Sequence, residues 1–73
     1  MDQIKTGRFI AEQRKANGMT QRQLAEKLQL LGLDVDKNAI QRIEAGKRFV
    51  TDIELVYLAN VFQITLDTLL GQS

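Results

Sequence analysis

Apolar side chains recur along this 73-residue chain at three- and four-residue spacing, and no stretch alternates apolar and polar residues as a half-buried strand does. This period predicts five helices, over roughly residues 4–17, 21–31, 37–45, 52–62 and 66–70. We expect the core to consist of Ile10, Leu24, Ala25, Leu28, Leu31, Ile40, Ile43, Leu55, Leu58, Ala59, Phe62, Ile64, Leu66, Leu69 and Leu70. Because the connections between these segments are short, the pattern predicts one compact all-α domain over residues 1–73.

The same start signal precedes each of the last four predicted helices: an apolar residue, a side chain that can cap a helix, and a second apolar residue further on. A capping oxygen accepts hydrogen bonds from free backbone N–H groups of the first turn, and the apolar pair fixes the entry angle of the chain. The caps predicted in this way are Thr20, Asp36, Thr51 and Thr65, with Gln23 and Glu54 completing two capping boxes.

Glycines mark the predicted helix ends. Gly18, Gly32, Gly46 and Gly71 each follow a helical segment, where a residue in the left-handed conformation commonly ends a helix. Gly7 lies inside the first predicted helix instead, which suggests that another helix approaches closely at that point.

Composition excludes several classes of function. The chain has no cysteine and no histidine, so disulfides, thiolate chemistry and imidazole catalysis are excluded, and a metal site would need oxygen ligands alone. No apolar run reaches the length of a membrane span, and no signal peptide opens the chain. Asp34 and Asp36 could be imagined as paired carboxylates, but no base or metal cluster accompanies them. We expect a cytoplasmic protein that is not an enzyme and binds no cofactor, metal, membrane or small molecule.

Charge is divided unevenly between the two parts of the chain. Residues 1–48 carry ten basic and six acidic residues, a balance of +4, whereas residues 49–73 carry three acids and no base, a balance of −3. A basic front and an acidic rear orient a domain toward a polyanion, although small domains also divide their charge unevenly by chance.

One face of the predicted helix at 37–45 carries a polar stripe, and a short turn separates this helix from the one before it. The stripe consists of Lys37, Asn38, Gln41 and Arg42, while Ile40 lies elsewhere on the helix. In the major groove of DNA, Arg and Lys pair with guanine, and Asn and Gln pair with adenine. The stripe therefore fits a surface that reads bases; the alternative is a solvated helix face, which usually mixes Glu with Lys.

Three stretches, "MTQRQLAEKL", "AIQRIEAGKR" and "LVYLANVFQITLDTLLG", resemble in their order and spacing the phage repressor/Cro-type helix-turn-helix family, also called the Xre family. The resemblance runs from about residue 5 to residue 71 and implies a lambda-repressor-like bundle of five helices. It also implies a sequence-specific transcriptional regulator, above all a repressor, that is bacterial or phage-encoded and works on the nucleoid. The implied partner is double-stranded DNA with a palindromic operator, bound by a homodimer.

The resemblance assigns roles to matching positions. The base-reading positions of the recognition helix correspond to Lys37, Asn38, Gln41 and Arg42. The phosphate-binding positions, at the start of the preceding helix and in the loop after the recognition helix, correspond to Thr20, Gln21, Arg22, Lys47 and Arg48. Arg14 and Glu44 correspond to a structural ion pair that fixes the recognition helix against the first helix without touching DNA.

The sequence departs from the family pattern at several positions. Gln13 stands where the family usually has a core leucine, Gln63 stands where a glycine usually ends the fourth helix, and Asp34 stands at the glycine position of the tight turn.

The turn before the recognition helix is also longer than in the family. There, the residue that corresponds to Ile40 follows the one that corresponds to Ala25 by ten positions, whereas here it follows by fifteen. We expect the extra residues 29–33 to lengthen the second helix and to move the break to Gly32. The leucines of this stretch then need cover from the recognition helix, the fourth helix or a second subunit; they are Leu30, Leu31 and Leu33.

Two points stay open at this stage. The predicted helices at 52–62 and 66–70 contain no basic residue and could form a dimer face. Its candidate residues are Phe49, Tyr57 and Leu66, although core positions are favoured for all three. The alternative to DNA reading is a helical protein-interaction module, or an antitoxin of the same fold, whose contact patch is the exposed leucines of the long turn.

Overall fold

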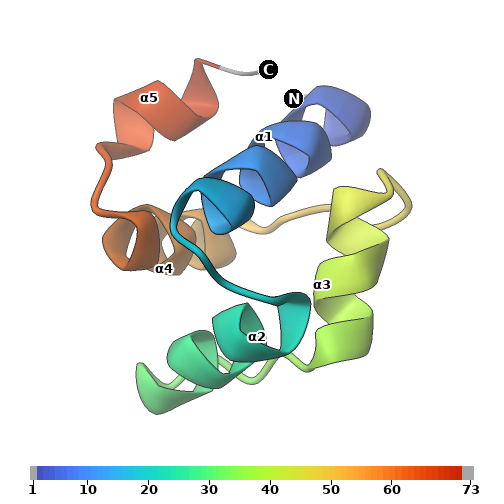
Figure 1. Ribbon diagram of the computed structural model, residues 1–73. Helices are drawn as coiled ribbons and strands as arrows, with labels where there is room; N and C mark the ends of the chain where they lie inside the picture. The colour runs from blue at the N-terminus through green and yellow to red at the C-terminus, as the bar shows by residue number, and fades with distance from the viewer. Residues whose placement is uncertain (1, 72–73) are drawn as a thin grey trace.

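A computed structural model describes residues 2–71 of the chain and contains five helices within that range (Figure 1). They are α1 (Gln3–Ala16), α2 (Gln21–Leu30), α3 (Lys37–Glu44), α4 (Asp52–Phe62) and α5 (Leu66–Leu70). The described residues form no strand. The all-α prediction is therefore confirmed, and no predicted helix end differs by more than one residue from the observed end.

The predicted caps explain why the helices begin where they do. The side chains of Thr20, Asp36, Thr51 and Thr65 each accept a hydrogen bond from a backbone N–H of the first turn. Both predicted capping boxes are present, since Gln23 bonds back to Thr20 and Glu54 bonds back to Thr51. The sequence reasoning missed one cap, Asp2, whose carboxylate accepts from the N–H groups of Ile4 and Lys5 and so starts α1 one residue early.

Side chains from all five helices form one core. Its apolar members are Ile10, Met19, Leu24, Ala25, Leu28, Val35, Ile40, Ile43, Val50, Leu55, Leu58, Ala59, Phe62 and Leu69. Met19, Val35 and Val50 belong to it because each is the apolar residue just before a helix cap, packed where the chain enters the helix.

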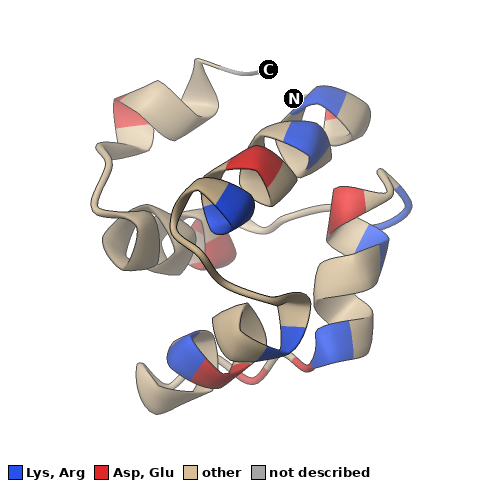
Figure 2. Ribbon diagram, viewed as in Figure 1, with Lys and Arg blue, Asp and Glu red and all other residues tan. Residues whose placement is uncertain are grey.

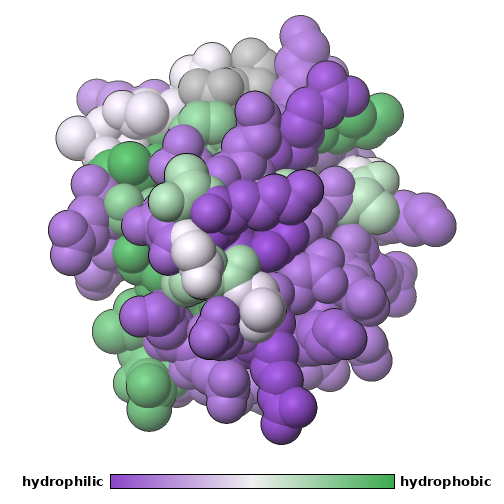
Figure 3. Space-filling model, viewed as in Figure 1, coloured by the Kyte–Doolittle hydropathy of each residue, from purple (hydrophilic) through white to green (hydrophobic). Residues whose placement is uncertain are grey.

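Three predicted core residues are wrong: Leu31, Leu66 and Leu70 are each about 40% exposed. All three lie at or next to a helix end, where the apolar period continues but the rest of the fold covers the side chain only in part. Phe49 is also exposed, whereas Tyr57 is half-buried and packs against the core. In Figure 3 hydrophobic surface lies over α4 and the end of α2, while the surface over α3 is hydrophilic.

Helix α3 packs against both α1 and α2, and α4 packs against α2 and α5. In Figure 1 α3 lies at one side of α1, with α4 and α5 at the other. Gly7 of α1 is buried where the two helices meet, and a Cβ atom built on it would overlap the backbone carbonyl of Ile43. The prediction that a helix approaches closely at Gly7 is confirmed.

Left-handed residues end several helices as expected, with one difference. Gly18, Gly32 and Gly46 have positive φ, but Gly71 has φ −63°, so the left-handed prediction is wrong there. Gln63, which stands in place of a family glycine, caps α4 with φ 56°. A side chain at this angle costs about 1 kcal/mol relative to glycine, and the N–H groups of Gln63 and Ile64 still bond to carbonyls of the last turn.

Replacing Gly7 with alanine should destabilise the fold, although alanine favours a helix. The added methyl group cannot avoid the Ile43 carbonyl without separating α1 from α3, and overpacking of this kind costs about 2 kcal/mol. Urea denaturation of Gly7→Ala against wild type measures the loss. Arg8→Ala, at the exposed neighbouring position, is the control and should stay within about 0.5 kcal/mol. A Gly7→Ala protein as stable as wild type would show that the two helices can separate at little cost.

Candidate nucleic-acid interface

Helix α2, a turn and α3 form a helix-turn-helix unit whose outer face is polar. The four predicted base-reading side chains are all exposed on α3; they are Lys37, Asn38, Gln41 and Arg42. Ile40 and Ile43, which are 0% and 2% exposed, fix the opposite face of α3 in the core. Figure 2 shows basic residues at both ends of α3 and in the loop after it, and none on α4 or α5.

The predicted phosphate-binding residues divide into two groups. Thr20, Arg22 and Lys47 have exposed side chains beside the stripe, at the start of α2 and after the end of α3. Gln21 is half-buried, and its Nε2 atom donates a hydrogen bond of 3.0 Å to Glu44. Arg48 is likewise occupied within the protein, by Glu54.

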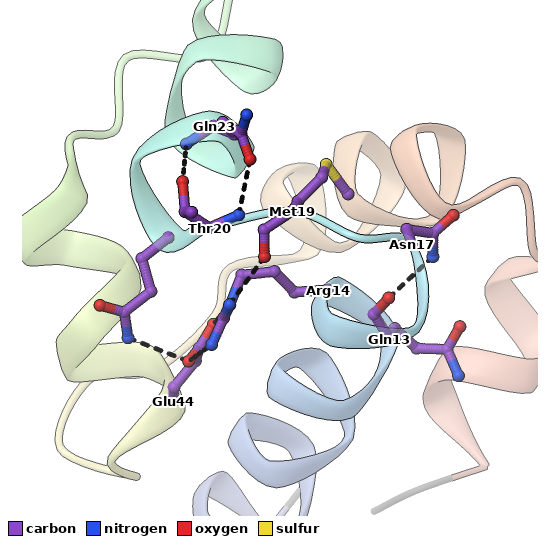
Figure 4. Close-up of polar contacts among 8 residues, drawn as sticks. Gln13, Arg14, Asn17, Met19, Thr20, Gln23 and Glu44 are labelled. Carbon is purple, nitrogen blue, oxygen red and sulfur yellow. Dashed lines mark hydrogen bonds and ion pairs between the residues drawn. The ribbon is translucent and has the colours of Figure 1, made fainter.

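Arg14 and Glu44 form the ion pair that the sequence predicts between the first helix and the recognition helix. The Arg14 Nε and Nη2 atoms donate to the two oxygens of Glu44 at 2.7 and 3.0 Å, and Nη1 donates to the Met19 carbonyl at 2.8 Å. These side chains are only 11% and 8% exposed. Figure 4 shows Arg14 between Glu44 and the Met19 backbone, so one guanidinium joins α1, α3 and the segment that enters α2. The bonds to Glu44 raise the pKa of Arg14 above its ordinary value, despite partial burial.

Arg48 and Glu54 form a second ion pair, which the sequence reasoning missed. The Arg48 Nη1 and Nη2 atoms donate to the two oxygens of Glu54 at 2.9 and 2.8 Å, and Nη1 also donates to the Phe49 carbonyl at 2.9 Å. These bonds lower the pKa of Glu54, with a further contribution from the N–H of Thr51, while burial opposes the shift. The predicted capping box already placed Glu54 next to the loop that carries Arg48. A carboxylate that caps with one oxygen has a second oxygen that can bind a cation, and this was the sequence signal for the pair.

The long turn between α2 and α3 has a defined path. Its break is at Gly32, with φ +102°, as predicted, and the Leu33 N–H bonds back to the Leu28 carbonyl to close the end of α2. Only two of the five extra residues, Gln29 and Leu30, extend the helix.

The leucines of the turn are covered only in part. Leu33 packs against the core, but Leu30 is 87% exposed and Leu31 lies beside it, next to Val61 of α4. Of the three leucines expected to need cover from α3, α4 or a second subunit, Leu33 alone is packed against the core of this chain.

Two kinds of feature are absent from residues 2–71. No group of three or more acidic side chains within residues 2–71 could hold a metal ion. No helix in that range is long and apolar enough to cross a membrane.

Comparison with known proteins gives one match. The model of a helix-turn-helix family matches residues 10–69, which include all of α2, the turn and α3. The searches of curated proteins and of solved structures gave no match.

Removing one member of the Arg14–Glu44 pair should be strongly destabilising. Arg14→Met leaves a nearly buried carboxylate without its cation, which costs about 3 kcal/mol. Chemical denaturation measures the loss, and Arg8→Met, an exposed arginine of the same helix, should stay within about 0.5 kcal/mol of wild type. The double variant Arg14→Met/Glu44→Leu should lose less than the sum of the two single variants. Additive losses would mean that the pair contributes no coupling.

Acid should weaken the fold partly through Glu54. Because the folded-state pKa of Glu54 is lowered, its carboxylate stabilises the fold above about pH 4.5, and this contribution is lost as the pH falls through the lowered pKa. The free energy of unfolding, measured by urea denaturation at a series of pH values, should fall more steeply below pH 4.5 in wild type than in Glu54→Gln. Arg48→Met should flatten the curve in the same way. The same slope in all three proteins would contradict this assignment.

Proposed function

The chain belongs to the helix-turn-helix family of DNA-binding regulators, and we propose that it is a sequence-specific repressor that inserts α3 into the major groove. One observation carries the proposal: four exposed side chains that suit base edges lie along α3, and the fully buried Ile40 holds the helix from behind. We assign base reading to Lys37, Asn38, Gln41 and Arg42. A domain that occupies a groove site excludes other proteins from it, which favours repression.

Phosphate contacts are proposed for the side chains that the fold leaves available. Thr20 and Arg22, at the N-terminus of α2, and Lys47, after α3, flank the stripe on two sides and would fix its register on the duplex. Gln21 can contribute its second N–H, because one N–H donates to Glu44. Arg48 is the weakest member of the predicted set, since a phosphate would have to compete with Glu54 for its guanidinium.

We further propose that the protein binds a palindromic operator as a homodimer, in the cytoplasm of a bacterial cell. One domain of this size buries little DNA surface, and a two-fold arrangement doubles it. The support on the protein is exposed apolar side chains at α4, which carries no basic residue: Ile53 and Val56 on the helix and Phe49 in the loop before it, 53–66% exposed. A protein-interaction module or antitoxin with little DNA reading is the second candidate, favoured by the exposed Leu30 and Leu31.

Selection of bound duplexes from a random pool tests the proposal. A regulator should enrich a palindromic consensus, whereas an interaction module should enrich no sequence. Salt gives an independent readout, because release of counterions lowers DNA affinity steeply between about 50 and 200 mM. A binding constant that is flat over this range, or a pool without enrichment, would overturn the proposal.

Two substitutions should separate base reading from phosphate binding. Arg42→Ala should cost roughly 1–3 kcal/mol on the selected site and little on random DNA, because it removes a base contact. Lys47→Ala should weaken both duplexes about equally and reduce the salt slope by about one. Fluorescence anisotropy on the two duplexes at several salt concentrations measures both effects. If the two variants behaved alike, the assignment of these residues to different roles would be wrong.

A further inference from the structure

Two glutamines of α2 hold the two ends of α3. Gln21, the first residue of α2, donates through Nε2 to Glu44, the last residue of α3, at 3.0 Å. Gln29, near the end of α2, donates through Nε2 to the carbonyl of Val35 at 2.7 Å, directly before the cap of α3. The first bond belongs to the network around Arg14, whereas the second lies in the stretch that makes this turn longer than the family pattern.

The bond from Gln29 adds a directional contact to a part of the chain whose side chains are otherwise held by apolar packing. Val35 and Ile40 anchor the start of α3 in the core, but burial of apolar surface has no preferred direction. A hydrogen bond does have one, because it weakens steeply away from a linear geometry. Among the side-chain bonds of the described residues, Gln29 alone ties α2 to the segment that enters α3. The other contacts at this end of α3 are apolar or lie within the backbone, whereas Glu44 at its far end is held by Arg14 and Gln21.

The same glutamine lies close to the proposed reading surface. Gln29 and Lys37, the first residue of α3, line one shallow hollow together with Arg22. The Val35 carbonyl that accepts from Gln29 is two residues before Lys37, and the Asp36 cap between them accepts from the N–H of Ala39 at 2.8 Å. A change at Gln29 is therefore transmitted through one short, hydrogen-bonded segment to the first turn of α3.

We propose that Gln29 is a positioning residue for sequence reading: its bond to Val35 sets the tilt of α3 and thereby the placement of Lys37 and Asn38 against the bases. This inference rests on the proposed DNA-binding function. Gln29 itself need not touch DNA, because it acts through the backbone of α3. The extra residues of the turn thus bring with them the side chain that restores a fixed geometry at the start of the helix.

The test compares Gln29→Met and the isosteric Gln29→Glu with wild type. Both variants lack the side-chain N–H that donates to Val35. The Gln29 side chain is exposed, so the fold should tolerate both replacements. Binding is measured on the selected duplex and on random DNA at one salt concentration. In both variants the ratio of the affinity for the selected duplex to the affinity for random DNA should fall about tenfold, the effect of one misplaced base contact. The affinity of Gln29→Met for random DNA should stay close to that of wild type. Gln13→Met, on α1 and away from α3, makes the same chemical change and should keep the wild-type ratio.

Amide hydrogen exchange without DNA supplies a second readout. The N–H groups of Ala39 and Ile40, which bond to Asp36, should exchange several-fold faster in Gln29→Met, while the N–H of Leu55 in α4 keeps its rate. If wild type selects a sequence and the two Gln29 variants keep its affinity ratio, that result overturns this inference alone. Equal loss on both duplexes would do the same, because a merely structural defect lowers all binding. A wild-type protein that selects no sequence would overturn the proposed function and this inference together.

Discussion

The position of α3 depends on its contact with α1, because an eight-residue helix has little stability of its own. Two adjacent features make that contact. Gly7 lets the backbone of Ile43 approach α1 to a distance that no larger residue permits, and Arg14 then binds Glu44 from the next turns of the same helix. The close approach also brings the carboxylate within reach of Gln21, so the start of α2 is tied to the same point.

Two ion pairs decide which charges can face a polyanion. Glu44 is neutralised by Arg14 and Glu54 by Arg48, so two acids near α3 and its loop do not oppose an approaching phosphate backbone. The cations used in these pairs are removed from the exposed set at the same time. Four exposed basic side chains remain among the proposed DNA-binding residues: Lys37 and Arg42 belong to the stripe on α3, and Arg22 and Lys47 lie outside α3. The position of these four basic side chains, more than the net charge of +1, would decide how a polyanion meets α3.

The sequence predicts the helices closely because local signals agree with the apolar period. The cap of each helix, as at Thr20, and the positive φ of Gly32 depend on near neighbours and can be read from a short window. Burial at helix ends cannot be predicted from a short stretch of sequence. Leu31 and Leu70 continue the apolar period, but their exposure depends on which helix lies opposite. The partner of Arg48 was missed for a related reason: a long flexible cation next to the predicted interface could equally reach solvent, DNA or Glu54, and only the path of the loop decides.

The bonds of Arg14 and Arg48 explain why the extra residues lie in the turn between α2 and α3. Residues inserted between α1 and α2 would displace the Met19 carbonyl from Arg14, and residues inserted after α3 would disturb the segment that holds Arg48 against Glu54. The turn before α3 has no such bond to the Arg14 network, which lies at the opposite end of that helix. Added residues can therefore be accommodated there, provided that they bury Leu33 and close the end of α2 at Gly32. The consequence is a domain whose turn before α3 can lengthen while the attachment of α3 to α1 stays the same.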